Sequence, residues 1–187
     1  MVPRLLIIIA VVLGACLTVE NLSTTLNLTV KDEALEIGGI INSRAHGQFA
    51  RLIEDNPQVE RIVFGDIDGS TDGDAVAEIG YLIRDLGFET ELHADSEVYS
   101  GGVDLFLAGT SRYVAPGGIL GVHEWSTSFG RARGYPRNSS HHEPTRGYIA
   151  DMLGSDSFYW FTLQAAPFDE VYIMSRADML RFGILTR

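Results

Sequence analysis

Hydrophobic residues alternate with polar ones in some stretches of the chain and recur every three to four positions in others. Residues 34–42 alternate and are rich in β-branched side chains, so they predict a strand, and residues 59–64 and 88–94 predict two more. Ser43 is expected to cap a helix that ends before Pro57, because serine is a favoured N-cap and proline cannot continue a helix.

Further elements follow in the same alternating order. Gly87 ends a second predicted helix, whose apolar residues recur at helical spacing: Ala75, Ile79, Leu82, Ile83 and Leu86. An apolar helix is predicted over residues 103–108, and two short strands over 112–115 and 119–125. Repeated strand-helix-strand units imply a parallel sheet with right-handed crossovers.

Three segments are predicted as loops, at residues 65–73, 95–102 and 126–145. The last of them is rich in Ser, Arg, Gly and His and is long for a structureless loop, so it is either mobile or functional. The C-terminal part is predicted to be helical in three pieces: 146–154, 156–166 and 175–182.

Composition narrows the class of protein. The chain has 187 residues, 45% of them hydrophobic, which suits a single domain with a sizeable core. Its formal net charge of −11 is spread along the chain, so we exclude nucleic-acid binding through phosphate neutralisation. The single cysteine excludes an internal disulfide and a cysteine-cluster zinc site.

The first residues have the plan of a secretory signal, because Arg4 precedes an unbroken apolar run over residues 5–12. That run is too short to span a bilayer, which takes about 20 apolar residues. Leu-Gly-Ala-Cys at residues 13–16 resembles the lipobox of bacterial lipoproteins, which implies a lipid on Cys16; the alternative is a plain signal peptide cut nearby. We expect three segments: a signal peptide (1–15), a tether or edge strand (16–33) and one domain (34–187).

A candidate nucleophile lies where a loop meets the apolar helix. Ser100 is followed by Gly101 and Gly102, whose first-turn amides suit an oxyanion and whose missing side chains admit a substrate carbonyl. The predicted helix runs away from Ser100 over about the same length as the predicted strand that leads back to His123. His123 is therefore expected to lie beside Ser100, as a general base. A serine before two glycines is also a common N-cap, and a histidine at a strand end is often structural.

Several short motifs follow one another along the chain: Ser100, Ala108-Gly109, Pro116, Gly121-Val122-His123 and a final predicted helix over 174–184. In order and spacing they resemble the Clp protease and crotonase superfamily, in particular the Clp proteolytic subunit, signal peptide peptidase A and uncharacterised periplasmic relatives. The resemblance covers roughly residues 35–186. It implies an α/β fold, a spiral of β-β-α units with a parallel sheet core and a C-terminal helical region.

The resemblance also implies roles for individual residues. Ser100 would be the nucleophile and His123 the base, and amides of Gly69, Ser70 and Gly101 would hold the oxyanion. The oxyanion loop departs from the family's Ser-Pro-Gly-Gly, because it reads Ile-Asp-Gly-Ser and retains only the glycine at 69. Asp68 adds negative charge there.

Two further departures concern acids. Val171 aligns with the aspartate of the Clp triad, so either Asp169 or Glu170 orients the histidine, or the enzyme uses a Ser-His dyad. Asp104 occupies a helical position that is usually apolar in the family. It is either a buried functional acid or a residue that faces His123.

Two other segments carry side chains that bind metal ions in proteins. Residues 66–74 alternate oxygen ligands as calcium loops do, but they lack the glycine and the glutamate of an EF-hand, and ordinary loops have the same composition. His141, His142 and Glu143 are adjacent in sequence and do not converge easily on one metal ion. We therefore expect neither a metal nor a cofactor.

The first hypothesis is a secreted serine hydrolase of the peptidase type, anchored through Cys16 on the periplasmic side of a bacterial cell envelope. Its partners would be a peptide or protein substrate, the membrane through the N-terminal lipid and, by resemblance, further copies of itself. The alternative is a non-catalytic envelope lipoprotein that uses the same fold for binding or scaffolding. A coenzyme A enzyme of the crotonase type ranks third.

Overall fold

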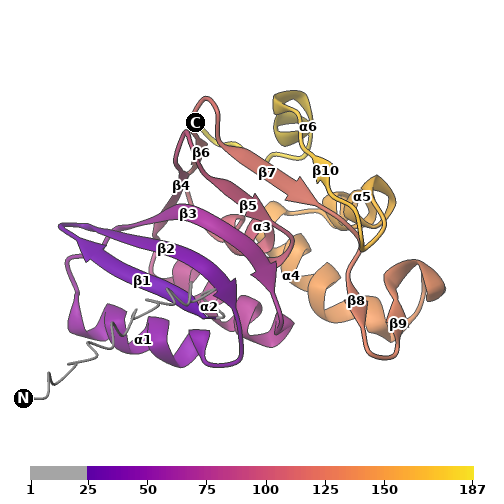
Figure 1. The fold of residues 1–187 in the computed structure, drawn as a ribbon, viewed down its shortest axis with the longest axis horizontal. Helices are drawn as coiled ribbons and strands as arrows, with labels where there is room; N and C mark the ends of the chain where they lie inside the picture. The colour runs from indigo at the N-terminus through magenta and orange to yellow at the C-terminus, as the bar shows by residue number, and fades with distance from the viewer. Residues whose placement is uncertain (1–24) are drawn as a thin grey trace, which may run out of the picture.

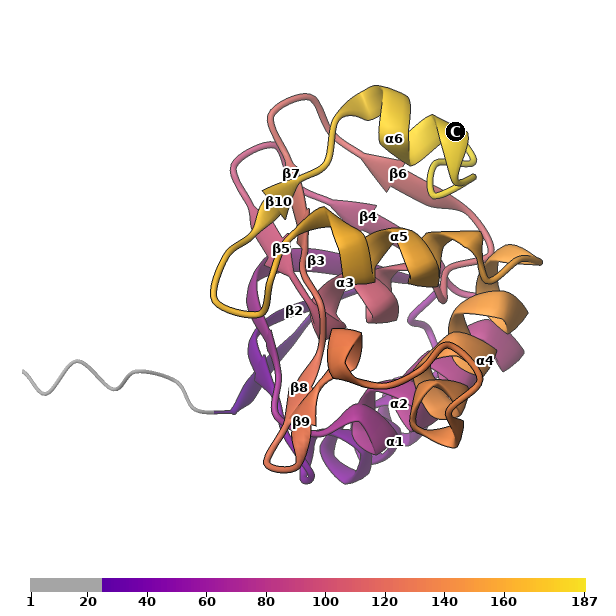
Figure 2. The same ribbon diagram turned by 90° about the vertical axis from the view of Figure 1, so that its right-hand side faces the viewer.

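The structure, a computed structural model, describes residues 25–187. An eight-stranded sheet forms its centre, and helices α2, α3 and α4 lie together on one side of that sheet (Figures 1 and 2). The sheet is made of β1 (Leu26–Lys31), β2 (Ala34–Ile41), β3 (Arg61–Ser70), β4 (Glu89–Leu92), β5 (Glu97–Tyr99), β6 (Arg112–Val114), β7 (Ile119–Val122) and β10 (Tyr172–Ile173).

The helices alternate with these strands up to β7 and then follow one another. They are α1 (Ala45–Asp55), α2 (Gly73–Asp85), α3 (Gly101–Phe106), α4 (Glu143–Leu153), α5 (Ser157–Ala165) and α6 (Arg176–Arg181). A small second sheet pairs β8 (Ser126–Thr127) with β9 (Gly130–Arg131), and two 3₁₀ turns follow, η1 (Ala132–Gly134) and η2 (Ser140–His142).

The sheet has a parallel core with antiparallel edges. Strand order is β1-β2-β3-β5-β7-β10, with β4 beside β3 and β6 beside β4. All pairs among β2 to β7 are parallel, whereas β1 pairs antiparallel with β2 and β10 antiparallel with β7. The predicted α/β class with a parallel core is confirmed.

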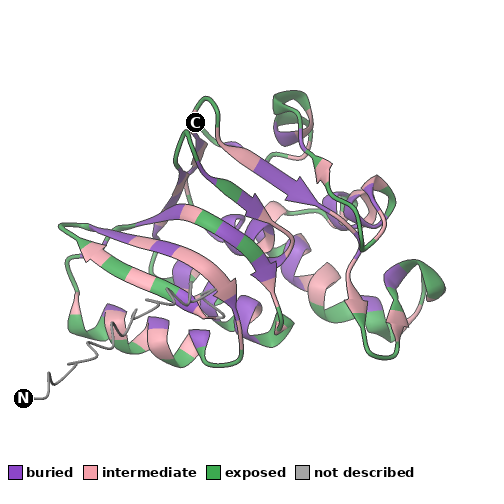
Figure 3. Ribbon diagram, viewed as in Figure 1, coloured by how far each residue is buried: buried purple, intermediate pink, exposed green. Residues whose placement is uncertain are grey.

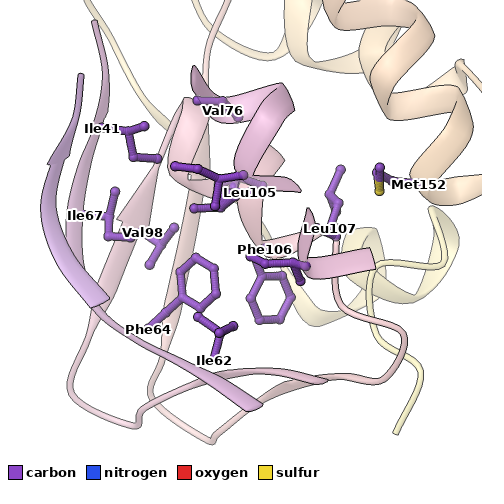
Figure 4. Close-up of a cluster of buried hydrophobic side chains, with 14 of the residues drawn as sticks. Ile41, Ile62, Phe64, Ile67, Val76, Val98, Leu105, Phe106, Leu107 and Met152 are labelled. Carbon is purple, nitrogen blue, oxygen red and sulfur yellow. The ribbon is translucent and has the colours of Figure 1, made fainter. Parts of the chain in front are cut away.

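Apolar side chains from the central strands meet those of α3 between the sheet and the helices (Figure 4). Figure 3 marks the buried positions along these elements. Phe64 of β3 packs edge-on against Phe106 of α3, with ring centroids 5.5 Å apart. All residues of α3 except Asp104 are buried, so α3 is an interior helix. Burial of these apolar side chains stabilises α3 and therefore the position of the residue at its start.

Two predicted loops contain strand instead. β3 continues through the expected loop 65–73 as far as Ser70, and β5 lies within the expected loop 95–102. Aspartate and glycine in the second half of β3 have low strand propensity, and β5 is only three residues long. Parallel pairing of Ile41 with Ser70 and of Ile67 with Val98 supplies hydrogen bonds that local sequence does not reveal.

Other boundaries also differ. Ser43 is not the helix cap: α1 begins at Ala45, and the amide of Arg44 donates to the Asn42 side chain (2.9 Å) instead. The expected long loop 126–145 contains the β8/β9 hairpin and both 3₁₀ turns, and α4 starts at Glu143 rather than at 146.

The segment expected to be a tether or an edge strand includes β1, which lies at the edge of the sheet beside β2. The predicted signal peptide and Cys16 lie outside the described residues. Within residues 25–187, no helix is both long and apolar enough to cross a bilayer.

Candidate active site

Ser100 lies at the turn from β5 into α3, in a backbone conformation that residues other than glycine rarely adopt. Its φ is +52° and its ψ −124°, and its hydroxyl makes no capping hydrogen bond. The turn is held from both sides, because the Ser100 amide donates to the Gly121 carbonyl (3.0 Å) and its carbonyl accepts from Val103 (2.9 Å). Strain of this kind costs about 1 to 3 kcal/mol and persists only where the surroundings fix it.

Gly69 brings the backbone of β3 directly against this serine. A Cβ atom added to Gly69 would lie 3.2 Å from the Ser100 Cβ and 3.8 Å from its Oγ. Gly69 also has φ +129°, which side chains disfavour. Glycine is therefore required here for both its conformation and its size.

The other two predicted oxyanion residues meet on the same side of Ser100. A Cβ on Gly101 would lie 2.3 Å from the Ser70 Oγ, so the end of β3 and the start of α3 are in close contact. Because Gly101 is the first residue of α3, its amide has no acceptor within the helix. The structure thus gathers Gly69, Ser70 and Gly101 around the serine.

His123 follows β7, whose parallel pairing with β5 places Tyr99 opposite Gly121. The histidine is half-buried, with its ring edge-on to Phe168 (centroids 5.5 Å apart) and its Nδ1 2.8 Å from the Glu124 carbonyl oxygen. Since a carbonyl oxygen only accepts, Nδ1 carries the proton and Nε2 carries the lone pair. No hydrogen bond joins Ser100 and His123 in the structure.

Neither candidate triad acid forms an ion pair or a hydrogen bond with His123. Asp169 forms an ion pair with Arg131 (3.1 Å). Its own backbone amide and, next, Arg131 lower the pKa of Asp169. Glu170 is exposed and makes no side-chain hydrogen bond to any residue between 25 and 187. Antiparallel pairing of Tyr172 with Val122, continued by one residue, leaves apolar Val171 opposite His123.

Asp104 lies one turn after Ser100 on α3. Burial raises the pKa of its carboxyl from 3.8 to about 7. The Tyr148 hydroxyl of α4 donates to the Asp104 backbone carbonyl (2.9 Å), not to its carboxylate. The carboxylate itself forms neither an ion pair nor a hydrogen bond with the described part of the chain, which is costly for a buried charge.

Sequence reasoning missed how the segment after β7 is held. The buried Glu124 carboxylate accepts from the Arg133 amide (3.0 Å), and the Tyr159 hydroxyl accepts from the Trp125 indole (2.9 Å) and bonds His142 Nδ1 (2.6 Å). The one available signal was a glutamate two residues after an apolar strand.

The rival sites take other roles. Asp66 and Asp68 belong to β3, and Asp72 caps α2 by accepting from the Ala75 amide (3.0 Å). His141 stacks on Tyr135, with centroids 4.2 Å apart, while His142 is buried against Tyr159. Between residues 25 and 187 no three His, Cys, Asp or Glu side chains are grouped so as to hold a metal ion.

No family model matches the chain, and no curated protein is similar to it in sequence. Solved structures are similar in fold. A serine-to-alanine mutant of the 1510-N membrane-bound stomatin-specific protease has a TM-score of 0.55 and 18% identity over 82% of this chain and 76% of its own. A lysine-to-alanine mutant of that protease, in complex with a substrate peptide, has a TM-score of 0.54 and 16% identity over 84% of this chain and 75% of its own.

An enoyl-CoA hydratase/isomerase from Marinobacter aquaeolei has a TM-score of 0.56 and 11% identity, over 86% of this chain and 69% of its own. At such low identities the likeness concerns the fold alone. Proteases and enoyl-CoA hydratases share it, so neither activity follows from the fold by itself. The chain has the fold of the Clp protease and crotonase superfamily.

Proposed function

We propose that this protein is a secreted, lipid-anchored serine hydrolase that cleaves peptide bonds with Ser100 and His123. The observation that carries the proposal is the Ser100 turn: a strained serine with an unbonded hydroxyl, pressed between the glycine at the end of β3 and the first amides of α3. Such strain is characteristic of functional positions. A merely structural N-cap would use its hydroxyl to cap the helix, which Ser100 does not.

In the mechanism, the Ser100 hydroxyl attacks the substrate carbonyl while His123 Nε2 takes its proton. The Glu124 carbonyl holds the opposite ring nitrogen, so the imidazole keeps the tautomer that a base requires. Amides of Gly69 or Ser70 and of Gly101 then stabilise the oxyanion, each donor being worth about a hundredfold to a thousandfold in rate. His123 then gives its proton to the leaving amine, and the acyl group remains as an ester on Ser100. A water molecule, deprotonated by His123, attacks this ester, releases the carboxylic acid and restores the Ser100 hydroxyl.

The proposal specifies a dyad and not a triad. Asp169 is held by Arg131, and an apolar valine stands opposite His123. A backbone carbonyl orients the ring without carrying the negative charge that stabilises an imidazolium in a full triad. We therefore expect slower catalysis than in a protease with an aspartate at that position.

Labelling with a fluorophosphonate tests the proposal, because this reagent reacts with activated serines. The full chain, purified in detergent, should be labelled, and Ser100→Ala and His123→Ala should both abolish labelling. Ser43→Ala changes an exposed serine outside the Ser100 turn and serves as the matched control. A folded wild-type protein that resists the reagent would contradict the proposal.

A second candidate is a non-catalytic binding protein of the same fold. The Arg131–Asp169 ion pair favours it, because it leaves His123 without a carboxylate partner. This candidate predicts no labelling at Ser100 but unaltered folding of the Ser100→Ala variant.

The proposal includes attachment to the periplasmic face of a bacterial envelope through a lipid on Cys16 and assembly into a homo-oligomer. Cys16→Ser should release the protein from sedimented membranes into the soluble fraction, since a lipid is the only anchor proposed. Retention of the variant in membranes would remove the lipid from the account. Sedimentation of the detergent-solubilised protein would test the oligomer.

A further inference from the structure

The interior helix that starts at Ser100 carries one charge. Asp104 is flanked by Val103 and Leu105, both fully buried, yet it keeps part of its own surface exposed. The helices α4 and α5 enclose it with Tyr148 and Tyr159, whose hydroxyl pKa values are both raised in part by the negative charge of Asp104. The carboxyl group is thus surrounded by protein but still reachable from solvent.

The tyrosines beside Asp104 do not hydrogen-bond its carboxylate. Tyr148 donates its hydroxyl proton to the Asp104 backbone carbonyl, and the Tyr159 hydroxyl is engaged by Trp125 and His142. The neighbouring cations are engaged as well: Arg84 bonds the carbonyls of Leu107, Ala108 and Met152, and Arg146 pairs with Glu143 and Asp156. The carboxylate therefore lacks a counter-charge in the described protein, a costly arrangement unless a ligand supplies one.

The position of Asp104 relative to Ser100 suggests which ligand that is. Asp104 follows Ser100 by four residues, and its amide donates to the Ser100 carbonyl (3.3 Å), so about one helical turn separates the two residues. A substrate residue whose carbonyl lies at Ser100 would need a side chain of about that length to reach the carboxylate.

Charges near the ends of β3 and β5 point to the same kind of ligand. Asp66 accepts from the Glu97 amide (3.0 Å), and both Asp66 and Asp68 contribute to the raised pKa of Tyr99, the residue before Ser100. Together with a net charge of −11, these carboxylates make the approach to Ser100 attractive to cations.

We propose that Asp104 selects substrates with a lysine or arginine side chain at the cleaved bond, by pairing with its ammonium or guanidinium group. The inference rests on the proposed hydrolase activity of Ser100 and names its substrate class. Pairing supplies the missing counter-charge, and a shorter or uncharged side chain would leave the carboxylate unpaired.

The test compares two fluorogenic peptides that differ only at the residue before the cleaved bond, lysine in one and norleucine, of similar length but uncharged, in the other. We expect the wild type to prefer lysine by at least tenfold in kcat/KM. Asp104→Asn should bring this ratio close to one, and Asp104→Leu should reverse it. Asp85→Asn, which removes an exposed charge at the end of α2, should keep the preference.

A second readout separates failure of this inference from failure of the proposed activity. If fluorophosphonate labels Ser100 but the enzyme shows no preference for lysine, the activity stands and the role of Asp104 is wrong. If Ser100 is not labelled, binding of benzamidine is measured by titration calorimetry. The wild type should bind it at least tenfold more tightly than Asp104→Asn does; equal binding would overturn the role of Asp104 whatever the activity of Ser100.

Discussion

The two sides of the candidate site differ in how tightly they are packed. On one side, β3, β5 and α3 converge on Ser100 through parallel pairing and through close contacts from Gly69 and Gly101. On the other side, the turn after α5 and the two-residue strand β10 lie at the sheet edge, where Val171 and Phe168 are about half exposed and Asp169 pairs with Arg131.

This difference shows which parts of a hydrolase site a buried core specifies. The oxyanion amides belong to backbone that is packed against the core, and the Ser100 hydroxyl stands on the same backbone turn. The packing that stabilises the fold therefore also fixes their positions. A triad acid on an edge segment has few packed neighbours to hold it in place. Here Asp169 pairs with an arginine of the β8/β9 hairpin and not with His123. We therefore expect substitutions on the Ser100 side to have large effects and those on the edge side to have small ones.

The largest effect is expected from Gly69→Ala. The added methyl group meets the Ser100 Cβ at 3.2 Å in a backbone conformation that alanine disfavours, so the turn must shift. We predict a loss of at least a hundredfold in the fluorophosphonate labelling rate. Gly73→Ala adds the same group at the start of α2 with nothing within 4 Å, and should label like the wild type. Equal rates for both variants would contradict the close contact at Ser100.

Asp104→Asn should produce an intermediate effect on stability, and this effect depends on pH. The folded pKa of about 7 lies above the unfolded value of 3.8, so the charged form destabilises the fold as pH rises from about 4 to 7. Tyr148 and Tyr159 interact electrostatically with the group, but neither hydroxyl bonds its carboxylate. The variant should gain roughly 2 to 4 kcal/mol in unfolding free energy over the wild type at pH 8, and little at pH 4.

Urea denaturation at the two pH values measures that gain. Asp85→Asn provides the control, since Asp85 is exposed and its removal should change the two unfolding free energies alike. A gain for Asp104→Asn that is the same at pH 4 and pH 8 would show that the carboxylate is not held in a desolvated place.

The smallest effect is expected from Asp169→Asn. Because this carboxylate pairs with Arg131 and not with His123, the labelling rate should stay within about twofold of the wild type. Arg131→Gln removes the other member of the ion pair and serves as the companion variant. A loss of tenfold or more in Asp169→Asn alone would identify a triad and would abolish the distinction between the two sides of the site.

Sequence patterning carried much of the fold but little of the site's connectivity. The order of strands and helices, the parallel core and the place of Ser100 at the start of an apolar helix follow from hydrophobic periodicity and glycine positions. The second half of β3 could not be predicted, because aspartate and glycine become strand there only through pairing with distant strands. β5 could not be predicted because a strand of three residues has too short a pattern to show alternation. The Arg131–Asp169 pair depends on residues 38 positions apart, which no local pattern relates.

The central claim is that Ser100 is an activated nucleophile, and locating the labelled residue tests it most directly. The full chain is treated with a fluorophosphonate, digested, and the modified peptide is sequenced by mass spectrometry. The account predicts one modification, on Ser100, in wild type and in Asp169→Asn. Modification of another residue, or none on a folded protein, would contradict it.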